Sequence, residues 1–212
     1  MKNKLFWTVI AIVALVGFFF LSELWDAFQR RGQNQFMLQL SRGENFEAEE
    51  TFKFYFLDPN KVVGQVNMTD FPVVVSGGLP LYYFVVWLGN DRLLQLMFEK
   101  GAEIKLTSPS GTNALHYAQS VERASFLIDQ GIDLNAQEVN GGKKTFTKLM
   151  MAVNEGDFKL VELLLNHGAD SNVKMYNGID AEEIARQRGH TNILELIEFS
   201  NLGNSDSQLE ED

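Results

Sequence analysis

The feature that most constrains this chain is a pattern of apolar residues that returns at an almost constant interval. One copy occupies residues 145–173, where a short apolar segment ends near Gly156 and a second one stops at Gly168. Four aliphatic residues of the second segment fall on one helical face, namely Leu160, Val161, Leu164 and Leu165. This periodicity predicts two short helices in succession.

Equivalent positions in four such copies are held by Leu81, Leu115, Leu149 and Glu182, which lie 34, 34 and 33 residues apart. A helix pair of this size cannot bury its apolar face alone and needs a neighbour on each side. The period therefore predicts an array of stacked helix pairs whose second helices share one continuous core.

The second copy contains the most informative motif. Residues 111–118 read Gly-Thr-Asn-Ala-Leu-His-Tyr-Ala and resemble the ankyrin signature Gly-x-Thr-Pro-Leu-His-x-Ala, with Asn113 and Ala114 in place of Thr and Pro. Residues 78–82 and 178–185 open two further copies. On these motifs the chain resembles the ankyrin-repeat family over residues 77–199. The resemblance implies an all-α helical solenoid with β-turn fingers and repeats at about 77–110, 111–144, 145–177 and 178–199.

The second repeat departs from the others. Leu115 and Gly131 are 16 residues apart, whereas Leu149 and Gly168 are 19 apart, so its helix pair is predicted to be about one turn shorter. The finger that follows is long, and its Asn-Gly-Gly-Lys-Lys tip at residues 140–144 supplies the positive φ angles of a tight hairpin. Such a basic tip is either a partner contact or a tolerated surface insertion.

The first 25 residues predict a membrane anchor. Residues 5–21 contain no charged residue and would span roughly 26 Å as a helix, close to the thickness of a bilayer core. Trp7 and Trp25 lie where interfacial aromatic residues are expected. Lys2 and Lys4 leave a cleaved signal peptide as the alternative, but the segment lacks a small-x-small cleavage site, which favours an uncleaved signal anchor. The short head favours an N-inside arrangement, which in a bacterium places the repeats in the periplasm.

Residues 26–76 are predicted to form a juxtamembrane helix, ended by Gly43, and an N-terminal cap. Aromatic residues alternate over residues 51–57 and predict a strand, with residues 61–68 as its hairpin partner. Residues 79–88 are apolar on all sides, which predicts burial either by this cap or by a partner.

The end of the chain is polar. Charged residues on both helices of the last repeat are typical of a capping repeat. Residues 200–212 are small, polar and acidic and are predicted to be a disordered tail.

The residues offer no catalytic chemistry. The chain has no cysteine, and its net charge of −10 disfavours non-specific binding to nucleic acid. The three histidines, His116, His167 and His190, each have a structural role at hand: a turn contact, a helix end and a helix start. We therefore predict no catalytic, cofactor or metal site. An enzyme hidden in residues 44–76 is disfavoured because that segment has neither His nor Cys.

The family resemblance implies protein recognition by the finger tips and first helices. The candidate contacts are three groups of tip residues: Thr107, Ser108, Pro109 and Ser110; Gln137, Glu138, Val139, Asn140, Lys143 and Lys144; and Lys174, Met175, Tyr176 and Asn177.

A small, cysteine-free, membrane-anchored ankyrin protein also resembles the immunity proteins that bacteria encode beside type VI secretion lipase effectors. That resemblance implies a lipase effector toxin as the partner. A membrane-tethered scaffold or regulator of a resident enzyme shares every one of these features and is the alternative.

Overall fold

The structure is a computed structural model that describes residues 24–40, 42–54, 57–60, 62–63 and 79–207. Its contacts divide the chain into two compact units, residues 1–58 and 59–212. The predicted anchor lies almost entirely outside the described residues. Within the described ranges, no helix has both the length and the apolar character needed to cross a bilayer.

Two helices make up most of the described part of the first unit. A helix over residues 24–40 is followed by α2 (Asn45–Phe54), and the rings of Phe36 and Phe52 meet at 5.9 Å between centroids. The strand predicted over residues 51–57 is therefore wrong. Ala48 and Phe52 are buried one helical turn apart, and Lys53 bonds to Glu49 at 2.7 Å, so the helical spacing prevails over the aromatic alternation.

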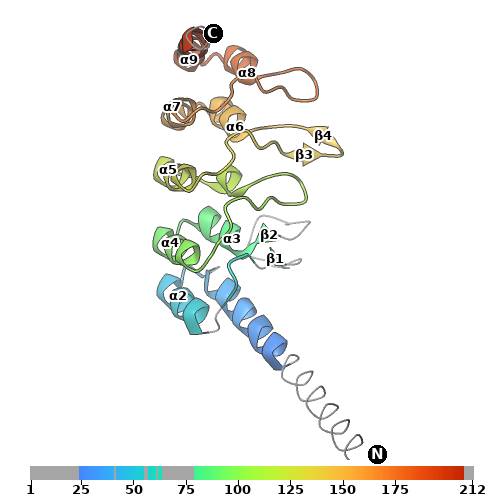
Figure 1. The fold of residues 1–212 in the computed structure, drawn as a ribbon, viewed down its shortest axis with the longest axis vertical. Coiled ribbons are helices and arrows are strands. Elements are labelled where there is room, and N and C mark those ends of the chain that lie inside the picture. The colour runs from blue at the N-terminus through green and yellow to red at the C-terminus, as the bar shows by residue number, and fades with distance from the viewer. Residues whose placement is uncertain (1–23, 41, 55–56, 61, 64–78, 208–212) are drawn as a thin grey trace, which may run out of the picture. The chain divides into compact units, whose positions relative to one another are not determined.

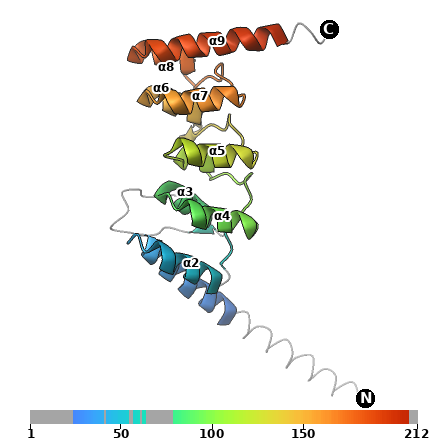
Figure 2. The same cartoon turned by 90° about the vertical axis from the view of Figure 1, so that its left-hand side faces the viewer.

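The second unit is a stack of four helix pairs with fingers projecting from one side (Figures 1 and 2). The first helices are α3 (Leu81–Leu88), η1 (Ala114–Tyr117), α6 (Lys148–Glu155) and α8 (Ala181–Arg188). The second helices are α4 (Asp91–Glu99), α5 (Val121–Asp129), α7 (Phe158–Asn166) and α9 (Thr191–Ser207). The predicted array of stacked helix pairs is confirmed.

Capping residues fix where these helices begin. A side-chain oxygen at the N-cap accepts a hydrogen bond from the backbone N–H three residues further on, at 3.0 to 3.3 Å. The residues that do so are Asn90, Ser120, Thr147, Asp157 and Asp180.

The core contains residues of the first helices, such as Leu81, Leu115 and Leu149, and rows of apolar residues from the second helices. Their inward-facing side chains are less than 9% exposed and recur in all four repeats: Leu93, Leu94 and Met97; Leu127; Leu160, Val161, Leu164 and Leu165; Ile193 and Ile197. An aromatic series joins the first two repeats, with Phe98 edge-on to both Tyr82 and Phe126 at 5.6 and 5.4 Å. The stacked pairs therefore share one interior.

Two small antiparallel ladders accompany the helices. β1 (Val62–Val63) pairs with β2 (Leu79–Pro80), and β3 (Val139–Asn140) pairs with β4 (Lys143–Lys144). The partner predicted for residues 61–68 was residues 51–57, and this pairing is wrong because β1 pairs with β2 instead. Residues 64–78 lie outside the described part of the chain.

The predicted disordered tail starts too early. Helix α9 continues to Ser207, so residues 200–207 are helical and residues 208–212 lie outside the described residues. Once a helix has been nucleated, each added residue gains one hydrogen bond for one fixed residue, and a polar sequence without Pro can continue it.

The shortening of the second repeat is confirmed, and the next repeat compensates for it. Its first helix is the 3₁₀ turn η1 rather than two turns of α-helix. Lys148, at the start of α6, is buried, and its Nζ donates to the carbonyls of Ala118 at 2.7 Å and His116 at 3.5 Å. Burial lowers the pKa of this amine. Lys148 thus satisfies carbonyls that end the short helix.

Lys148 also acts on the signature histidine. His116 Nδ1 lies 2.9 Å from Oδ1 of Asn113, the contact with the neighbouring turn expected of this residue. Burial, followed by the positive charge of Lys148, lowers the pKa of His116 from 6.5 to about 4. His116 is therefore neutral at pH 7.

We expect Lys148→Met to lower the free energy of unfolding by about 1 to 3 kcal/mol, because the Ala118 carbonyl would stay buried without a donor. Urea denaturation of the full chain in a nonionic detergent, followed by circular dichroism, measures this change. The exposed Lys159→Met of α7 is the control and should change the value by less than about 0.5 kcal/mol. Equal effects of the two substitutions would contradict the capping role.

We expect His116→Gln to reduce the amount by which the free energy of unfolding falls in mild acid. The folded-state pKa is depressed, so only the unfolded chain takes up a proton between pH 6.5 and 4, and stability falls as the pH falls through this range. Between pH 7.5 and 5 the wild-type chain should lose about 2 kcal/mol more than the variant. Parallel losses would show that His116 titrates normally in the fold.

Candidate protein-binding surface

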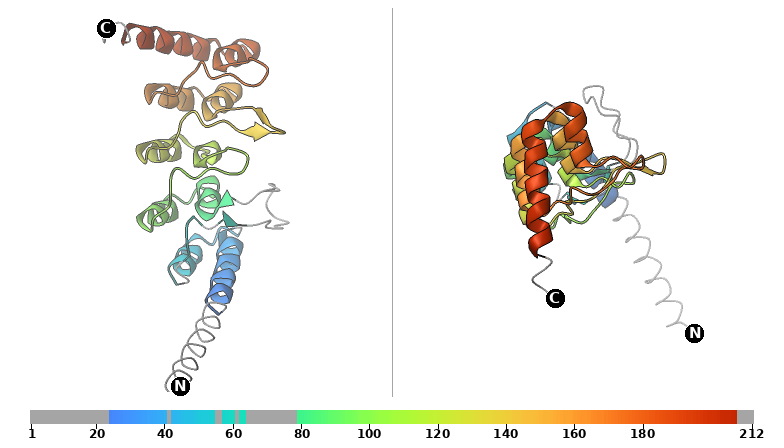
Figure 3. Two further views of the ribbon diagram at one scale, coloured as in Figure 1. Left: turned by 45° about the vertical axis from the view of Figure 1, so that its right-hand side comes forward. Right: turned by 90° about the horizontal axis from the view of Figure 1, so that it is seen from above.

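The predicted contact residues lie at the tips of three neighbouring fingers, which we call the finger row: residues 107–110, 137–144 and 174–177. The fingers leave the stack on the side of the first helices and lie one above another (Figures 1 and 3). The array of helix pairs thus brings together three segments that are about 30 residues apart in the sequence.

Hydrogen bonds join each finger to the next. The backbone N–H of Val139 donates to the carbonyl of Ser110 at 2.6 Å, and that of Tyr176 donates to the carbonyl of Lys144 at 2.9 Å. The side-chain amide of Gln137 adds a bond to the carbonyl of Lys174 at 3.1 Å. The finger row is therefore one laterally connected surface.

The contact between the first two fingers depends on a glycine. Gly111 has a φ of +77°, and a Cβ placed on it would lie 2.7 Å from the backbone oxygen of Gln137. Real Cβ atoms do not approach a carbonyl oxygen so closely, so a side chain here would push the second finger away. Gly111 thus permits the bond between Val139 and Ser110.

The long second finger ends in the predicted hairpin. Strands β3 and β4 are joined by Gly141 and Gly142, which have φ angles of +56° and +77°. Positive φ at both central residues is the geometry that matches the twist of a two-residue hairpin. The tip therefore has a defined shape that presents Asn140 and Lys143.

The structure exposes most of the predicted contact residues but not all. Nine of them are exposed: Thr107, Pro109, Val139, Asn140, Lys143, Lys144, Lys174, Tyr176 and Asn177. Ser110, Gln137, Glu138 and Met175 are half-buried. Ser108 is buried, and its hydroxyl lies 2.6 Å from that of Thr112, so it holds its own turn and cannot meet a partner directly. The partner-binding role of the others stays a prediction.

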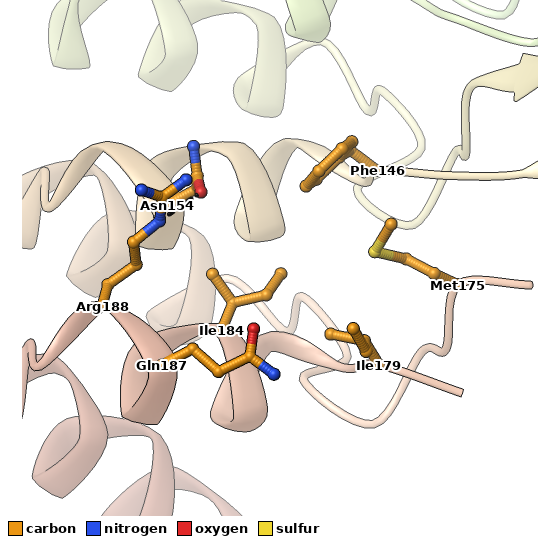
Figure 4. A pocket seen from close by; sticks show the side chains of 7 residues that line it. All are labelled: Phe146, Asn154, Met175, Ile179, Ile184, Gln187 and Arg188. Atoms are coloured by element: carbon orange, nitrogen blue, oxygen red, sulfur yellow. Dashed lines mark hydrogen bonds between the residues drawn. The ribbon is translucent and has the colours of Figure 1, made fainter. Parts of the chain in front are cut away.

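An open pocket of about 390 Å³ lies beside the finger row, between the third and fourth repeats (Figure 4). Its apolar lining comes from the fingers and from α8: Phe146, Met175, Ile179 and Ile184. Opposite the finger side chains, Nε of Arg188 donates to Oδ1 of Asn154 at 2.8 Å, and Gln187 completes the lining.

Of these pocket residues, only Met175 is among the contact residues predicted from the sequence. Gln187 and Arg188 belong to the polar first helix of the predicted capping repeat, and no local motif links them to Phe146. The sequence feature that could have indicated the pocket is a pair of polar residues at equivalent positions of α6 and α8, Asn154 and Gln187, which face the fingers.

The charge of the finger row is opposite in sign to that of the chain. Lys143, Lys144 and Lys174 are exposed, whereas Glu138 is half-buried and accepts a hydrogen bond from Thr145 at 3.2 Å. The Lys143 ammonium lies 4.6 Å from the ring centroid of Tyr176, within the range of a cation–π contact.

The other two histidines also have structural contacts. Nδ1 of His167 lies 2.8 Å from the carbonyl of Leu163 at the end of α7, and the His190 ring lies beside Gly156. Within the residues that the structure describes, no cluster of three or more His, Asp or Glu side chains could hold a metal ion.

Comparison with known proteins supports the same family. Residues 81–175 match the family model described as ankyrin repeats, in three copies. The chain is 30% identical over 114 residues to an ankyrin repeat protein of Rickettsia bellii and 28% identical over 113 residues to an ankyrin repeat-containing protein of Treponema pallidum. It is also 30% identical over 122 residues to the mouse B-cell lymphoma 3 protein homolog.

These similarities concern the repeats. They cover 51%, 51% and 56% of this chain, and 61%, 37% and 26% of the respective relatives. The period, the stacked helix pairs and the family match agree that residues 81–175 are ankyrin repeats. Such repeats are protein-interaction modules.

We expect Gly111→Ala to destabilise the chain more than Gly131→Ala. Both glycines have positive φ, so both substitutions cost about 1 to 2 kcal/mol of backbone strain, but nothing lies within 4 Å of a Cβ at Gly131. The Gly111 variant should lose at least about 1 kcal/mol more, because it also disrupts the bond between fingers. Urea denaturation compares them, and equal losses would refute a tight contact between the fingers.

Proposed function

We propose that this chain is a non-catalytic, membrane-anchored binding protein that captures another protein with its finger row and first helices. The observation that carries the proposal is the finger row itself. Three fingers are joined by hydrogen bonds, yet their outer side chains are exposed and have the opposite charge to the chain. A pre-ordered surface loses little conformational entropy on binding, which favours recognition.

Membrane attachment is part of the proposal. Residues 5–21 contain no charged side chain, and Leu24 and Trp25, next to them, are 65% and 52% exposed. Apolar residues of this kind are suited to the membrane interface. We propose residues 1–25 as an uncleaved anchor in a bacterial inner membrane, with the repeats in the periplasm.

The specific function that this architecture favours is immunity against a secreted lipase effector. A binding surface fixed at the periplasmic side of the membrane would meet a phospholipase where its substrate lies, and occupation of the enzyme's active site would block it. The scaffold alternative requires the same surface but a resident, non-toxic partner. A lipase-type gene beside that of this chain would favour immunity.

Replacement of residues 137–144 by a Gly-Ser linker of equal length should abolish capture of the partner. The full chain in a nonionic detergent serves as bait, and the captured proteins are identified by mass spectrometry. Lys159→Ser with Glu162→Ser, two exposed changes on α7, is the control and should capture as the wild type does. Unchanged capture by the linker variant would remove the second finger from the binding site.

Immunity and scaffolding are then separated by the partner's activity. A captured lipase should be toxic when produced alone in the periplasm and harmless when produced with this chain. A partner that is not toxic would contradict the immunity function and favour the scaffold.

A further inference from the structure

The fingers concentrate positive charge on an acidic chain. The chain carries a net charge of −10, yet three of the four charged residues in the finger row are lysines with exposed side chains. The fourth, Glu138, is engaged by the hydroxyl of Thr145. The ammonium of Lys174 lies 4.0 Å from a carboxylate oxygen of Asp180. The local field at the tips therefore attracts anions although the chain as a whole repels them.

These lysines adjoin the apolar pocket. Met175 lines the pocket, while its neighbours Lys174 and Tyr176 are exposed on the outside of the same finger. The bond from Tyr176 N–H to the carbonyl of Lys144 holds the second finger beside the third. A ligand that fills the pocket would thus contact the finger that carries Lys174, beside the finger that carries Lys143 and Lys144.

The pocket offers an apolar wall on which a large side chain can pack. Phe146, Met175 and Ile179 form one wall, and Ile184 lies between them and the Arg188 side of the pocket (Figure 4). Burial of a leucine-sized side chain against such a wall contributes to affinity, and the lysines outside would fix its orientation.

We propose that the partner presents to this surface an acidic segment with one large apolar side chain, which enters the pocket while flanking carboxylates pair with Lys143, Lys144 and Lys174. This inference rests on the proposed function and adds the chemistry of the partner. Nucleic acid also offers anions, but three lysines on a chain of net charge −10 would not hold a long polyanion against repulsion.

Four fluorescein-labelled peptides of nine residues test the proposal by fluorescence anisotropy on the full chain in nonionic detergent. One contains glutamate with a central leucine, the second glutamate with a central glycine, the third lysine with a central leucine, and the fourth serine with a central leucine. The glutamate peptide with leucine should bind at least tenfold more tightly than the other three at low salt. Its advantage over the serine and lysine peptides should shrink as salt is added.

The sign of this preference separates the proposal from general electrostatics. A chain of net charge −10 without a local basic site would prefer the lysine peptide. Preference for the lysine peptide, equal binding of all four, or tighter binding of single-stranded RNA of equal length than of the glutamate peptide with leucine would overturn the proposal.

Variants locate the site. Lys143→Glu with Lys144→Glu should weaken the glutamate peptide at least tenfold, whereas Lys100→Glu with Lys159→Glu, exposed on the second-helix side of the stack, changes the net charge equally and should weaken it less than threefold. Met175→Ser should remove the advantage of leucine over glycine. Because the four lysines are exposed and Met175 is half-buried, circular dichroism should show that each variant keeps the fold. Equal weakening by both double variants would overturn the site.

Failure of the acidic-segment proposal can be told apart from failure of the proposed function. If a captured protein partner is insensitive to Lys143→Glu with Lys144→Glu, and the peptides show no acidic preference, the acidic-segment proposal fails while protein capture stands. If the peptides bind as expected, the chemistry of the site is supported even where the lipase identification fails.

Discussion

The structure depends on the burial of apolar rows between successive helix pairs. Each second helix offers one apolar face, and that face is covered by the first helix of its own repeat and by the neighbouring repeats. Removal of a buried leucine from such a row, for example Leu164, creates a cavity that costs about 2 to 5 kcal/mol. Everything that the fingers and pocket do follows from this stacking, since no finger position is defined by a single repeat.

Stacking alone would leave the fingers as separate loops. Here backbone hydrogen bonds run from finger to finger, and Gly111 allows the first and second to approach closely. The short first helix of the second repeat is part of the same arrangement, because Lys148 of the next repeat caps it. An irregular repeat is thus accommodated without interrupting the stack, and its long finger gains a support on each side.

The sequence predicted what depends on local chemistry and period. The spacing of Leu81, Leu115 and Leu149 predicted the array, and Asn140 with its two glycines predicted the hairpin tip. The prediction was wrong where two local patterns compete. The aromatic alternation of residues 51–57 fits a strand, whereas the spacing of Ala48 and Phe52 fits a helix. Packing of Phe52 on Phe36 favours the helix. The polar composition of residues 200–207 predicted disorder, but α9 continues through them.

Features made by contacts between repeats could not be predicted from the sequence. The capping by Lys148, the close approach at Gly111 and the pocket all join residues about 30 positions apart that share no motif. Asn154 and Arg188 are ordinary polar residues until the stack brings them to 2.8 Å. The finger tips were identified because the family resemblance marks them, but the burial of Ser108 shows that position in a finger does not ensure exposure.

The central claim is that the three fingers form one ordered surface before any partner binds. Amide hydrogen exchange in the free protein tests it at two donors, the N–H groups of Val139 and Tyr176, which donate across fingers. The account predicts that both exchange at least a hundredfold more slowly than unprotected amides, as members of the stacked unit. Exchange of these two amides at the unprotected rate, while α6 and α7 stay protected, would show that the fingers move independently and would contradict it.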